Sequence, residues 1–302
     1  MSIKSQSILY KTCKADIYFG DRVNPISISK LSLKRYKGPK SFDYTFIDFQ
    51  DSFKNQIKSS INSLNRIYKS QNDLRVIGLT DSKILDSIER ITEIANMPIE
   101  KTRREGFDYV YRKHLANICS SVFRIIKKDN SEVIVPLRGG ALVAGLAPIK
   151  KEKIIAIDCK RVPLKGSIGR MGFGMRLYYD SIKRGDRLSR KLKDIEGKVR
   201  ILEVCMASGL TTAGVLLNLY ARKVKVDSVE VVAPVMAQQG YEFVKKVAEF
   251  TNIKTTFATG AIFYRLGNYY EDSADSLMTD DGRYVVGNAT EILKSFLPKY
   301  IK

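Results

Sequence analysis

The chain has 302 residues, of which 44% are hydrophobic, enough for one large or two modest domains with a sizeable buried core. Its 52 Lys and Arg outnumber its 32 Asp and Glu, and the resulting formal net charge of +20 attracts polyanions such as polyphosphates and nucleic acids. A basic surface without such a partner explains the charge equally well. No run of about 18 apolar residues exists to span a bilayer, and the first residues lack the apolar segment of a signal peptide. We therefore expect a cytosolic protein outside the membrane.

The cysteine and histidine content argues against a zinc site. Cys13, Cys119, Cys159 and Cys205 lie far apart without a C-x-x-C pair, and His114 is the one histidine of the sequence. Structural zinc sites take four Cys or His ligands at short spacings. We expect the cysteines to be small buried hydrophobic residues in a reducing compartment, and His114 to be a structural residue on a helix.

Residues 1 to about 70 give the fewest signals. Residues 42–49 alternate as a half-exposed strand does, and residues 53–68 have helical spacing. A short apolar run at 76–79 precedes Thr80 and Asp81, which suit the N-cap of a helix over 83–95 that Pro98 ends. One long helix is expected over 102–127, because its apolar residues follow a single stripe.

From residue 132 the chain alternates between short β-branched strands and helices. The strands are expected at 133–136, 154–157, 199–204, 226–232 and 255–259, and the helices at 140–148, 211–222 and 237–250. Such alternation predicts an α/β fold with a doubly wound, mostly parallel sheet. Ligands of these sheets bind beyond the carboxyl ends of the strands, so the loops that follow strands are the candidate sites.

The strongest of these loops follows the strand at 199–204. It reads Glu203-Val-Cys-Met-Ala-Ser-Gly-Leu-Thr-Thr212. Its small residues let the backbone approach a phosphate, which free N–H groups at the start of the next helix would bind, and Glu203 suits a ribose diol or a hydrated Mg²⁺. An ordinary capped turn has a similar sequence. Neither a G-x-x-x-x-G-K-[ST] nor a G-x-G-x-x-G motif occurs.

A second loop, Val135-Pro-Leu-Arg-Gly-Gly-Ala141, also follows a strand. Gly139 and Gly140 permit unusual backbone angles and expose N–H groups, while Arg138 supplies a forked cation for a second phosphate. A glycine-rich helix start with a solvated arginine is equally consistent with these residues.

Two further segments carry possible chemistry. Residues 160–193 contain 11 Lys or Arg and two Asp, with interspersed glycines and aromatic residues. They suit a lid that closes over a polyphosphate, a surface for single-stranded nucleic acid, or a plain solvated loop. Near the C-terminus, residues 279–289 predict a turn, a short strand and a glycine, which would offer backbone groups to a planar heterocycle or simply end the sheet.

In this order and at these separations, the four segments resemble type I phosphoribosyltransferases, most closely uracil phosphoribosyltransferases, over about residues 100–297. The matching stretches are Lys101-Thr-Arg-Arg-Glu-Gly-Phe107 at a helix start, Pro136-Leu-Arg-Gly-Gly140 at the pyrophosphate loop, Arg161 at the opening of the flexible loop, Glu203-Val-Cys-Met-Ala-Ser-Gly-Leu210 at the phosphate loop, and Val232-Ala-Pro-Val235 at a turn after the next strand.

Departures from the family concern mainly the part that holds the base. Glu203 stands where the family has Asp, and Leu210 replaces a glycine of the phosphate loop. Tyr284-Val-Val-Gly-Asn-Ala289 lacks the family's Pro-Gly-Leu-Gly-Asp segment, for which Glu291 is an unaligned substitute. The resemblance thus preserves the sugar-phosphate half of the site, while the base half is altered.

The resemblance implies transfer of ribose 5-phosphate from phosphoribosyl diphosphate to a nucleobase or similar planar heterocycle, uracil-like in the first instance, with release of pyrophosphate, and so a role in nucleotide salvage. It also implies Mg²⁺ and a homodimer. Glu203, Arg138 and Arg161 would be catalytic, with Glu203 on the ribose hydroxyls and near Mg²⁺ through water. The remaining roles are the 5-phosphate site (Ala207, Ser208, Gly209, Leu210, Thr211 and Thr212), the pyrophosphate site (Arg138, Gly139, Gly140, Lys160 and Arg161) and the base pocket (Tyr284, Val285, Val286 and Gly287).

The same resemblance implies a domain organisation. Residues 96–302 would form the phosphoribosyltransferase-like domain, including the flexible basic loop 160–193, and residues 1–95 an α/β extension of unassigned role. The main alternative is a protein of this fold with lost or weak catalysis that binds nucleic acid or nucleotides as a regulator or a component of a complex. A glycosyltransferase or hydrolase with the same phosphate-binding loop is a third alternative, although the sequence offers no nucleophile for it.

Overall fold

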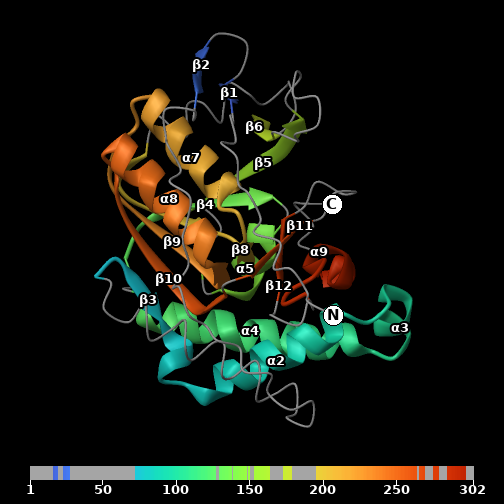
Figure 1. The fold of residues 1–302 in the computed structure, drawn as a ribbon. Coiled ribbons are helices and arrows are strands. Elements are labelled where there is room, and N and C mark those ends of the chain that lie inside the picture. The colour runs from blue at the N-terminus through green and yellow to red at the C-terminus, as the bar shows by residue number, and fades with distance from the viewer. Residues whose placement is uncertain are drawn as a thin grey trace, which may run out of the picture.

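The structure, a computed structural model, describes residues 16–19, 23–27, 72–126, 129–137, 139–147, 149, 153–163, 173–178, 195–263, 265–268, 275–278 and 284–296 (Figure 1). Within this part of the chain the strands are β1 (Asp16–Phe19), β2 (Val23–Ser27), β3 (Leu74–Val76), β4 (Glu132–Leu137), β5 (Ile154–Pro163), β6 (Phe173–Tyr178), β7 (Glu196–Leu202), β8 (Cys205–Met206), β9 (Lys225–Ala237), β10 (Lys254–Phe263), β11 (Arg265–Asn268) and β12 (Asp275–Met278). The strands expected at 42–49 and the helix expected at 53–68 lie outside the described residues.

One large sheet organises the molecule. Its described strands follow the order β2-β1-β6-β5-β4-β7-β9-β10-β3, with β8 paired to β9, while β11 and β12 form a separate antiparallel pair. The central pairs β5-β4, β4-β7, β7-β9 and β9-β10 are all parallel. Parallel strands are buried on both faces, which explains why the central strands carry nearly continuous β-branched runs. The predicted α/β fold with a mostly parallel sheet is confirmed.

Helices cover both faces of this sheet, as Figure 1 shows. The described helices are α2 (Ser82–Ala95), α3 (Ile99–Arg104), α4 (Phe107–Ile125), α5 (Gly139–Leu146), α7 (Leu210–Ala221), α8 (Gln238–Thr251) and α9 (Ala289–Ile292), with short 3₁₀ turns at Ile77–Leu79 and Lys294–Phe296. Alternate strand residues point to opposite faces: Val133 and Val135 join the core under α2, α4 and α5, and Ile134 joins the core under α7 and α8. The sheet is therefore doubly wound. No helix of the described residues is both long and apolar enough to cross a membrane.

Local signals placed α2 correctly. Asp81 is its N-cap, and the Asp81 carboxylate accepts a 3.0 Å hydrogen bond from the Lys83 N–H. The inward side chains of α2 recur every three or four residues and are almost fully buried; they are Ile84, Leu85, Ile88, Ile91 and Ile94.

Three expected elements differ in the structure. The single helix predicted over 102–127 is two helices, because Gly106 between α3 and α4 has a φ of +72° that breaks the helical path. The turn expected at 232–235 is instead part of β9, where Pro234 lies opposite Gly260, a residue without a side chain to obstruct its carbonyl. The strand expected at 154–157 is longer, since β5 runs from Ile154 to Pro163.

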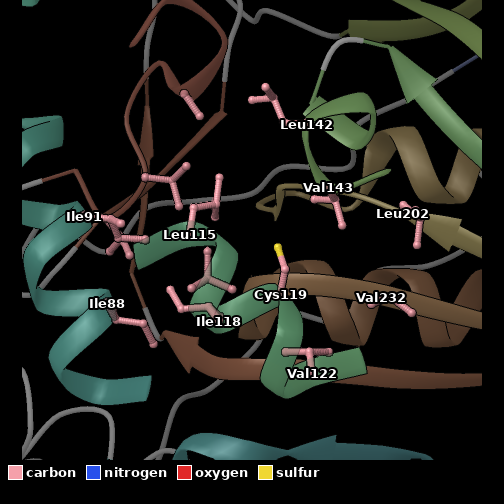
Figure 2. Close-up of a cluster of buried hydrophobic side chains, with 14 of the residues drawn as sticks. Ile88, Ile91, Leu115, Ile118, Cys119, Val122, Leu142, Val143, Leu202 and Val232 are labelled. Carbon is pink, nitrogen blue, oxygen red and sulfur yellow. The ribbon is translucent and has the colours of Figure 1, made fainter. Parts of the chain in front are cut away.

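Residues 72–95, assigned to the N-terminal extension, pack into the same core as the rest. β3 pairs in parallel with β10, so that Arg75 lies opposite Ala258. Ile88 and Ile91 of α2 are fully buried in one cluster with Leu115 and Ile118 of α4, as Figure 2 shows. The division into residues 1–95 and 96–302 stays a prediction, and residues 72–95 belong physically to the larger unit.

A buried ionic cluster joins three strands on the face covered by α4. Glu230 of β9 is 1% exposed, and its carboxylate accepts from Arg200 of β7 (2.7 Å) and forms ion pairs with Lys198 (3.3 Å) and Arg75 of β3. Asp129 pairs with Arg200 and Lys198, each at 3.0 Å. Burial raises the pKa of Asp129, but hydrogen bonds from Ser131 and Lys198 outweigh it and lower the pKa to about 2.

Candidate phosphate-binding site at the switch point of the sheet

β4 and β7 lie side by side in the middle of the sheet, although paired residues such as Glu132 and Val199 are 67 positions apart in the chain. The chain continues from β4 to β5 on one side, and from β7 to β9 on the other. Such a reversal of strand order opens a crevice beyond the carboxyl ends of the two strands, where doubly wound sheets bind ligands. Both loops singled out from the sequence begin here, after Leu137 and after Leu202.

The loop at 203–209 leads from β7 through the short strand β8 into α7. Glu203 is 9% exposed, and its backbone N–H donates to Val232 O at 3.0 Å, which fixes the carboxylate at the end of the strand. Gly209 is the N-cap of α7 and has a φ of +76°, a conformation that favours glycine. From the sequence, a small residue was expected here so that the backbone could approach a phosphate. The positive φ of Gly209 is a second reason for glycine at this position.

Helix α8 packs directly against this loop. A Cβ added to Gly240 would lie 2.2 Å from Ala207 O, and one added to Gly209 would lie 2.7 Å from Gly240 O and from Val244 Cγ2. The two glycines therefore allow the backbones to touch. Contact with α8 holds the loop in one conformation, which favours ligand binding because less conformational entropy is lost.

Helix α5 packs against the same loop from β4. A Cβ on Gly140 would lie 2.3 Å from Leu202 O, and one on Gly139 would lie 2.8 Å from Val204 Cγ1. Among the described residues the glycines with positive φ are Gly106, Gly197, Gly209 and Gly287, so the unusual backbone angles expected at 139 and 140 are not the reason for glycine there. Close approach of α5 to the end of β7 is the reason, and it brings the two candidate loops together.

Three helices begin at this edge of the sheet, and none has an acidic residue in its first turn. They are α5 after β4, α7 after β8 and α8 after β9. Helix N-termini carry unsatisfied N–H groups and a partial positive charge, which attract anions. Because none of the three first turns contains a carboxylate, these helix ends are suited to a phosphorylated ligand.

Hydroxyl groups line the start of α7. Ser208 Oγ lies 3.5 Å from the Leu210 nitrogen, and Ser208 and Thr211 are half-buried. Thr212 is fully buried, and its Oγ1 has no hydrogen-bond partner among the described residues. A buried hydroxyl of this kind destabilises the free protein by about 1–3 kcal/mol.

The expected pyrophosphate residues are only partly described. Arg138 lies outside the described residues. Lys160 and Arg161 are backbone positions of β5, which pairs with β6 so that Arg161 lies opposite Met175. β4 pairs with β5 up to Leu137 and Asp158, and residues 159–163 run on beyond that last pair. The segment 160–193 thus begins as a strand, a difference from the loop that was expected, and residues 164–172 and 179–193 lie outside the described part.

The C-terminal segment 284–287 lies against α2 and α4. Asn96 both donates to Tyr284 O (2.9 Å) and accepts from the Tyr284 N–H (3.0 Å), Thr92 Oγ1 donates to Val285 O (3.2 Å), and Tyr111 Oη donates to Val286 O (2.8 Å). Of the turn and short strand expected within 279–289, residues 279–283 lie outside the described part, and the carbonyls of 284–286 bond to the side chains of Asn96, Thr92 and Tyr111. Gly287 has a φ of +59°, and a Cβ added to it would lie 3.0 Å from Ala95 Cβ. The base-pocket assignment of these residues stays a prediction.

Tyr111 connects this tail with the phosphate loop. Burial raises the pKa of Tyr111, and the neighbouring thiols of Cys205 and Cys119 raise it further, so the phenol stays protonated and acts as a donor. Cys119 is itself fully buried, and burial raises its pKa to about 12. Figure 2 shows Cys119 among buried side chains of α4, with Val143 and Leu202 nearby. Cys119 is therefore the buried hydrophobic residue that was expected, whereas Cys205 is half-buried.

His114 is not part of this site. Its Nδ1 lies 3.2 Å from Ser87 Oγ, and burial, with Lys113 and Arg90 nearby, lowers its pKa. This fits the structural role expected from the sequence. Cys13 and the side chain of Cys159 lie outside the described residues.

Glu203 is the residue that was expected to lie near a magnesium ion. Among the described residues no cluster of three or more His, Cys, Asp or Glu side chains could hold a metal, and Glu203 is the acidic residue of the loop. Mg²⁺ commonly binds through one or two carboxylates, several waters and substrate phosphates. Glu203 offers one such carboxylate, and the presence of Mg²⁺ stays a prediction.

Sequence reasoning missed the residues that hold the tail. Thr92, Asn96 and Tyr111 occupy ordinary helical positions in the sequence, and no local pattern distinguishes them. Their partners lie 175 to 193 positions away, and no sequence periodicity reports such distant contacts.

Comparison with known proteins gives structural likeness alone. No protein-family model matches the chain, and no curated protein sequence matches it. The fold is similar to the AQ2163 protein from Aquifex aeolicus (TM-score 0.43, 16% identity, 72% of this chain and 97% of that one). It is also similar to a hypothetical protein from Neisseria gonorrhoeae with bound ppGpp (TM-score 0.35, 14% identity, 51% and 78%) and to a purine phosphoribosyltransferase from Pyrococcus horikoshii (TM-score 0.29, 17% identity, 54% and 95%). At these scores the likeness identifies no function for this chain.

Proposed function

We propose that this protein is a phosphoribosyltransferase that transfers ribose 5-phosphate from phosphoribosyl diphosphate to a planar nitrogen heterocycle and releases pyrophosphate. The observation that carries the proposal is the meeting of two loops at the switch point of the sheet. Gly140 brings the start of α5 against Leu202 O, directly beside Glu203 and the start of α7. One site there would hold the two phosphate groups and the sugar that links them.

Each group of the donor would have a partner of matching chemistry. Backbone N–H groups at the start of α7, with the hydroxyls of Ser208 and Thr211, would bind the 5-phosphate. The Glu203 carboxylate would accept hydrogen bonds from the ribose hydroxyls. Arg138, Lys160 and Arg161, with the N–H groups of Gly139 and Gly140, would bind the pyrophosphate.

Catalysis would depend on electrostatics. As the bond to pyrophosphate lengthens, positive charge develops on the ribose and negative charge on the leaving group. The Glu203 carboxylate would stabilise the first, and the three arginine and lysine side chains the second. Mg²⁺, when bound, would neutralise part of the diphosphate charge.

The acceptor would lie next to the tail segment 284–287. The carbonyls of Tyr284, Val285 and Val286 bond to α2 and α4. A trans peptide directs each following N–H away from its carbonyl, so the N–H groups of residues 285–287 point away from those helices. N–H groups so directed favour an acceptor with a hydrogen-bond-accepting edge, such as the oxo groups of a uracil-like base. A homodimer belongs to the same proposal, and light scattering tests it.

Titration with phosphoribosyl diphosphate tests the proposal directly. With Mg²⁺ present, the wild type should bind it in calorimetry and gain about 2.7 kcal/mol of stability at a concentration 100 times the Kd. Glu203→Gln and Arg138→Ala should weaken binding at least tenfold. Glu196→Gln is the matched control, because Glu196 lies exposed on the same strand at its opposite end.

The outcomes separate binding from catalysis. No heat and no thermal shift at millimolar ligand would rule the proposal out. Binding without pyrophosphate release across a panel of nucleobases would instead favour the alternative, a protein of this fold that binds nucleotides as a regulator. Pyrophosphate release with one base identifies the acceptor.

A further inference from the structure

A basic and aromatic surface lies at the end of the molecule where α3, the start of α4 and the C-terminal turns come together (Figure 1). Tyr109 is 66% exposed, and its ring meets that of Phe296 edge to face, with 5.0 Å between centroids. The guanidinium of Arg112 lies 4.8 Å from the centre of the Phe296 ring. We call this surface, formed by Tyr109, Arg112, Lys113, Lys294 and Phe296, the Tyr109 face.

Helical spacing places its cations beside the exposed ring. Tyr109, Arg112 and Lys113 occupy positions i, i+3 and i+4 of α4 and therefore share one side of that helix. Neither Arg112 nor Lys113 has a carboxylate partner among the described residues. The single acidic residue of α4, Asp108, is 8% exposed, so the outer side of the helix is cationic. Lys294 pairs with Glu291 at 3.6 Å.

Contacts link the parts of the face. The Arg112 guanidinium lies over the Phe296 ring, and Arg103 donates to Glu291 O at 2.6 Å, which joins α3 to α9. Rigid aromatic rings lose little conformational entropy when a planar group stacks on them. The face therefore combines an exposed stacking ring with adjacent positive charge.

We infer that the Tyr109 face binds single-stranded nucleic acid. A base would stack on the ring of Tyr109, and neighbouring phosphates would pair with Arg112 and Lys113. Stacking platforms flanked by cations are the usual means of binding single strands without sequence preference. The net charge of +20 would add attraction at longer range. This inference is independent of the proposed transferase reaction, because none of these residues belongs to the phosphate loops.

A second exposed aromatic pair offers a natural comparison. Tyr220 and Phe250 are 46% and 41% exposed, with ring centroids 5.9 Å apart. They lie in the last turns of α7 and α8, where helix carbonyls carry partial negative charge. Exposed Asp227 and Glu249 lie close in sequence to the two helix ends, as do exposed Lys223 and Lys225. The pair therefore has exposed rings and nearby lysines at the carboxyl ends of two helices, not on the cationic side of one helix, and it serves as the control.

Fluorescence anisotropy with labelled 20-nucleotide single strands of RNA and of DNA tests the inference. Tyr109→Ala should weaken binding roughly tenfold, as expected for the loss of one stacked base. The double variant Arg112→Ala with Lys113→Ala should reduce the slope of log K against log salt by about 1.4, or 0.7 for each lost phosphate contact. Tyr220→Ala, and Lys223→Ala with Lys225→Ala, should change affinity less than twofold.

Several results would overturn the inference. They are absence of binding to either strand by the wild type, equal losses in the Tyr109-face and control variants, and an unchanged salt slope in the double variant. Duplex bound as tightly as single strands would also overturn it. All variants should keep the wild-type melting temperature and the thermal shift with phosphoribosyl diphosphate, which separates this test from that of the proposed function.

Discussion

Nε of Arg200 donates to Oε2 of Glu230 over 2.7 Å, across the neighbouring parallel strands β7 and β9, and both side chains are at most 9% exposed. A buried pair of this kind is weak evidence for net stability, but removal of one partner leaves a buried charge uncompensated. The pair is therefore better understood as a constraint on which strands lie together than as a large source of stability.

Loss of Glu230 should strongly destabilise the protein. Glu230→Ala removes the carboxylate that Arg200, Lys198 and Arg75 share and leaves Asp129 as the partner of Arg200 and Lys198, and we expect the free energy of unfolding in urea to fall by about 1.5–3 kcal/mol. The control is Glu93→Ala, which breaks the partly exposed pair with Arg90 and should cost less than about 1 kcal/mol. Equal effects of the two variants would contradict the importance of burial.

Acid should remove the contribution of Asp129. Its pKa is about 2 in the folded protein against 3.8 for an unperturbed carboxyl. Because the folded pKa is the lower one, the stabilisation is present above about pH 4 and disappears as the pH falls towards 2. The difference in unfolding free energy between wild type and Asp129→Asn should therefore shrink over that window. A difference that stays constant from pH 6 to pH 2 would show that Asp129 titrates normally.

The two glycines of α5 should tolerate alanine unequally. Gly140→Ala places a methyl group 2.3 Å from a backbone carbonyl that cannot move away, and we expect a loss of about 1–3 kcal/mol and weaker binding of phosphoribosyl diphosphate. Gly139→Ala meets the Val204 side chain, which can rotate, so its effect should be smaller. Thermal melting and calorimetry measure both, and the reverse ranking would argue against the close approach of α5 to β7.

The hydroxyl of Tyr111 should be needed to hold the tail. Tyr111→Phe leaves the buried Val286 carbonyl without its donor and should cost about 1–3 kcal/mol. Amide hydrogen exchange should rise locally at residues 284–292. Tyr109→Phe is the matched control on the same helix, since the Tyr109 ring is exposed, and it should leave both quantities unchanged.

The buried hydroxyl of Thr212 should be dispensable for folding. Thr212→Val keeps the shape of the side chain and removes an oxygen atom without a partner among the described residues, so the unfolding free energy should stay the same or rise by up to about 3 kcal/mol. Denaturation by urea measures this. A marked loss of stability would mean that the hydroxyl bonds to a group outside the described residues.

Much of the fold could be predicted because its signals are local. The alternation of β-branched runs and helices gave the class of the sheet, and the Asp81 cap gave the start of α2. The break at Gly106 was missed because residues 102–105 have no apolar pattern of their own, and a single glycine with a positive φ leaves no other local signal. The length of β9 was missed because Pro234 suggests a turn, and only the distant Gly260 makes it compatible with a strand.

The position of the two candidate loops could also be predicted from the sequence. The carboxyl-edge rule brings the loops after β4 and β7 together, and the structure bears this out through Gly139 and Gly140. The means by which the tail is held was not predictable, because Asn96 and Tyr284 meet only in the folded chain. The roles of Arg138, Lys160 and Arg161 stay predictions.

The contact between Asn96 and Tyr284 also bears on the order of folding. Its two residues are 188 positions apart, and the sheet between them must form before the tail can reach α2 and α4. Contacts between residues so far apart in the chain form slowly, because closing the long loop costs conformational entropy before the contact contributes any stabilisation. We expect the tail to dock in a late kinetic phase, so that a chain arrested before that phase would expose Val285 and Val286 to chaperones and proteases.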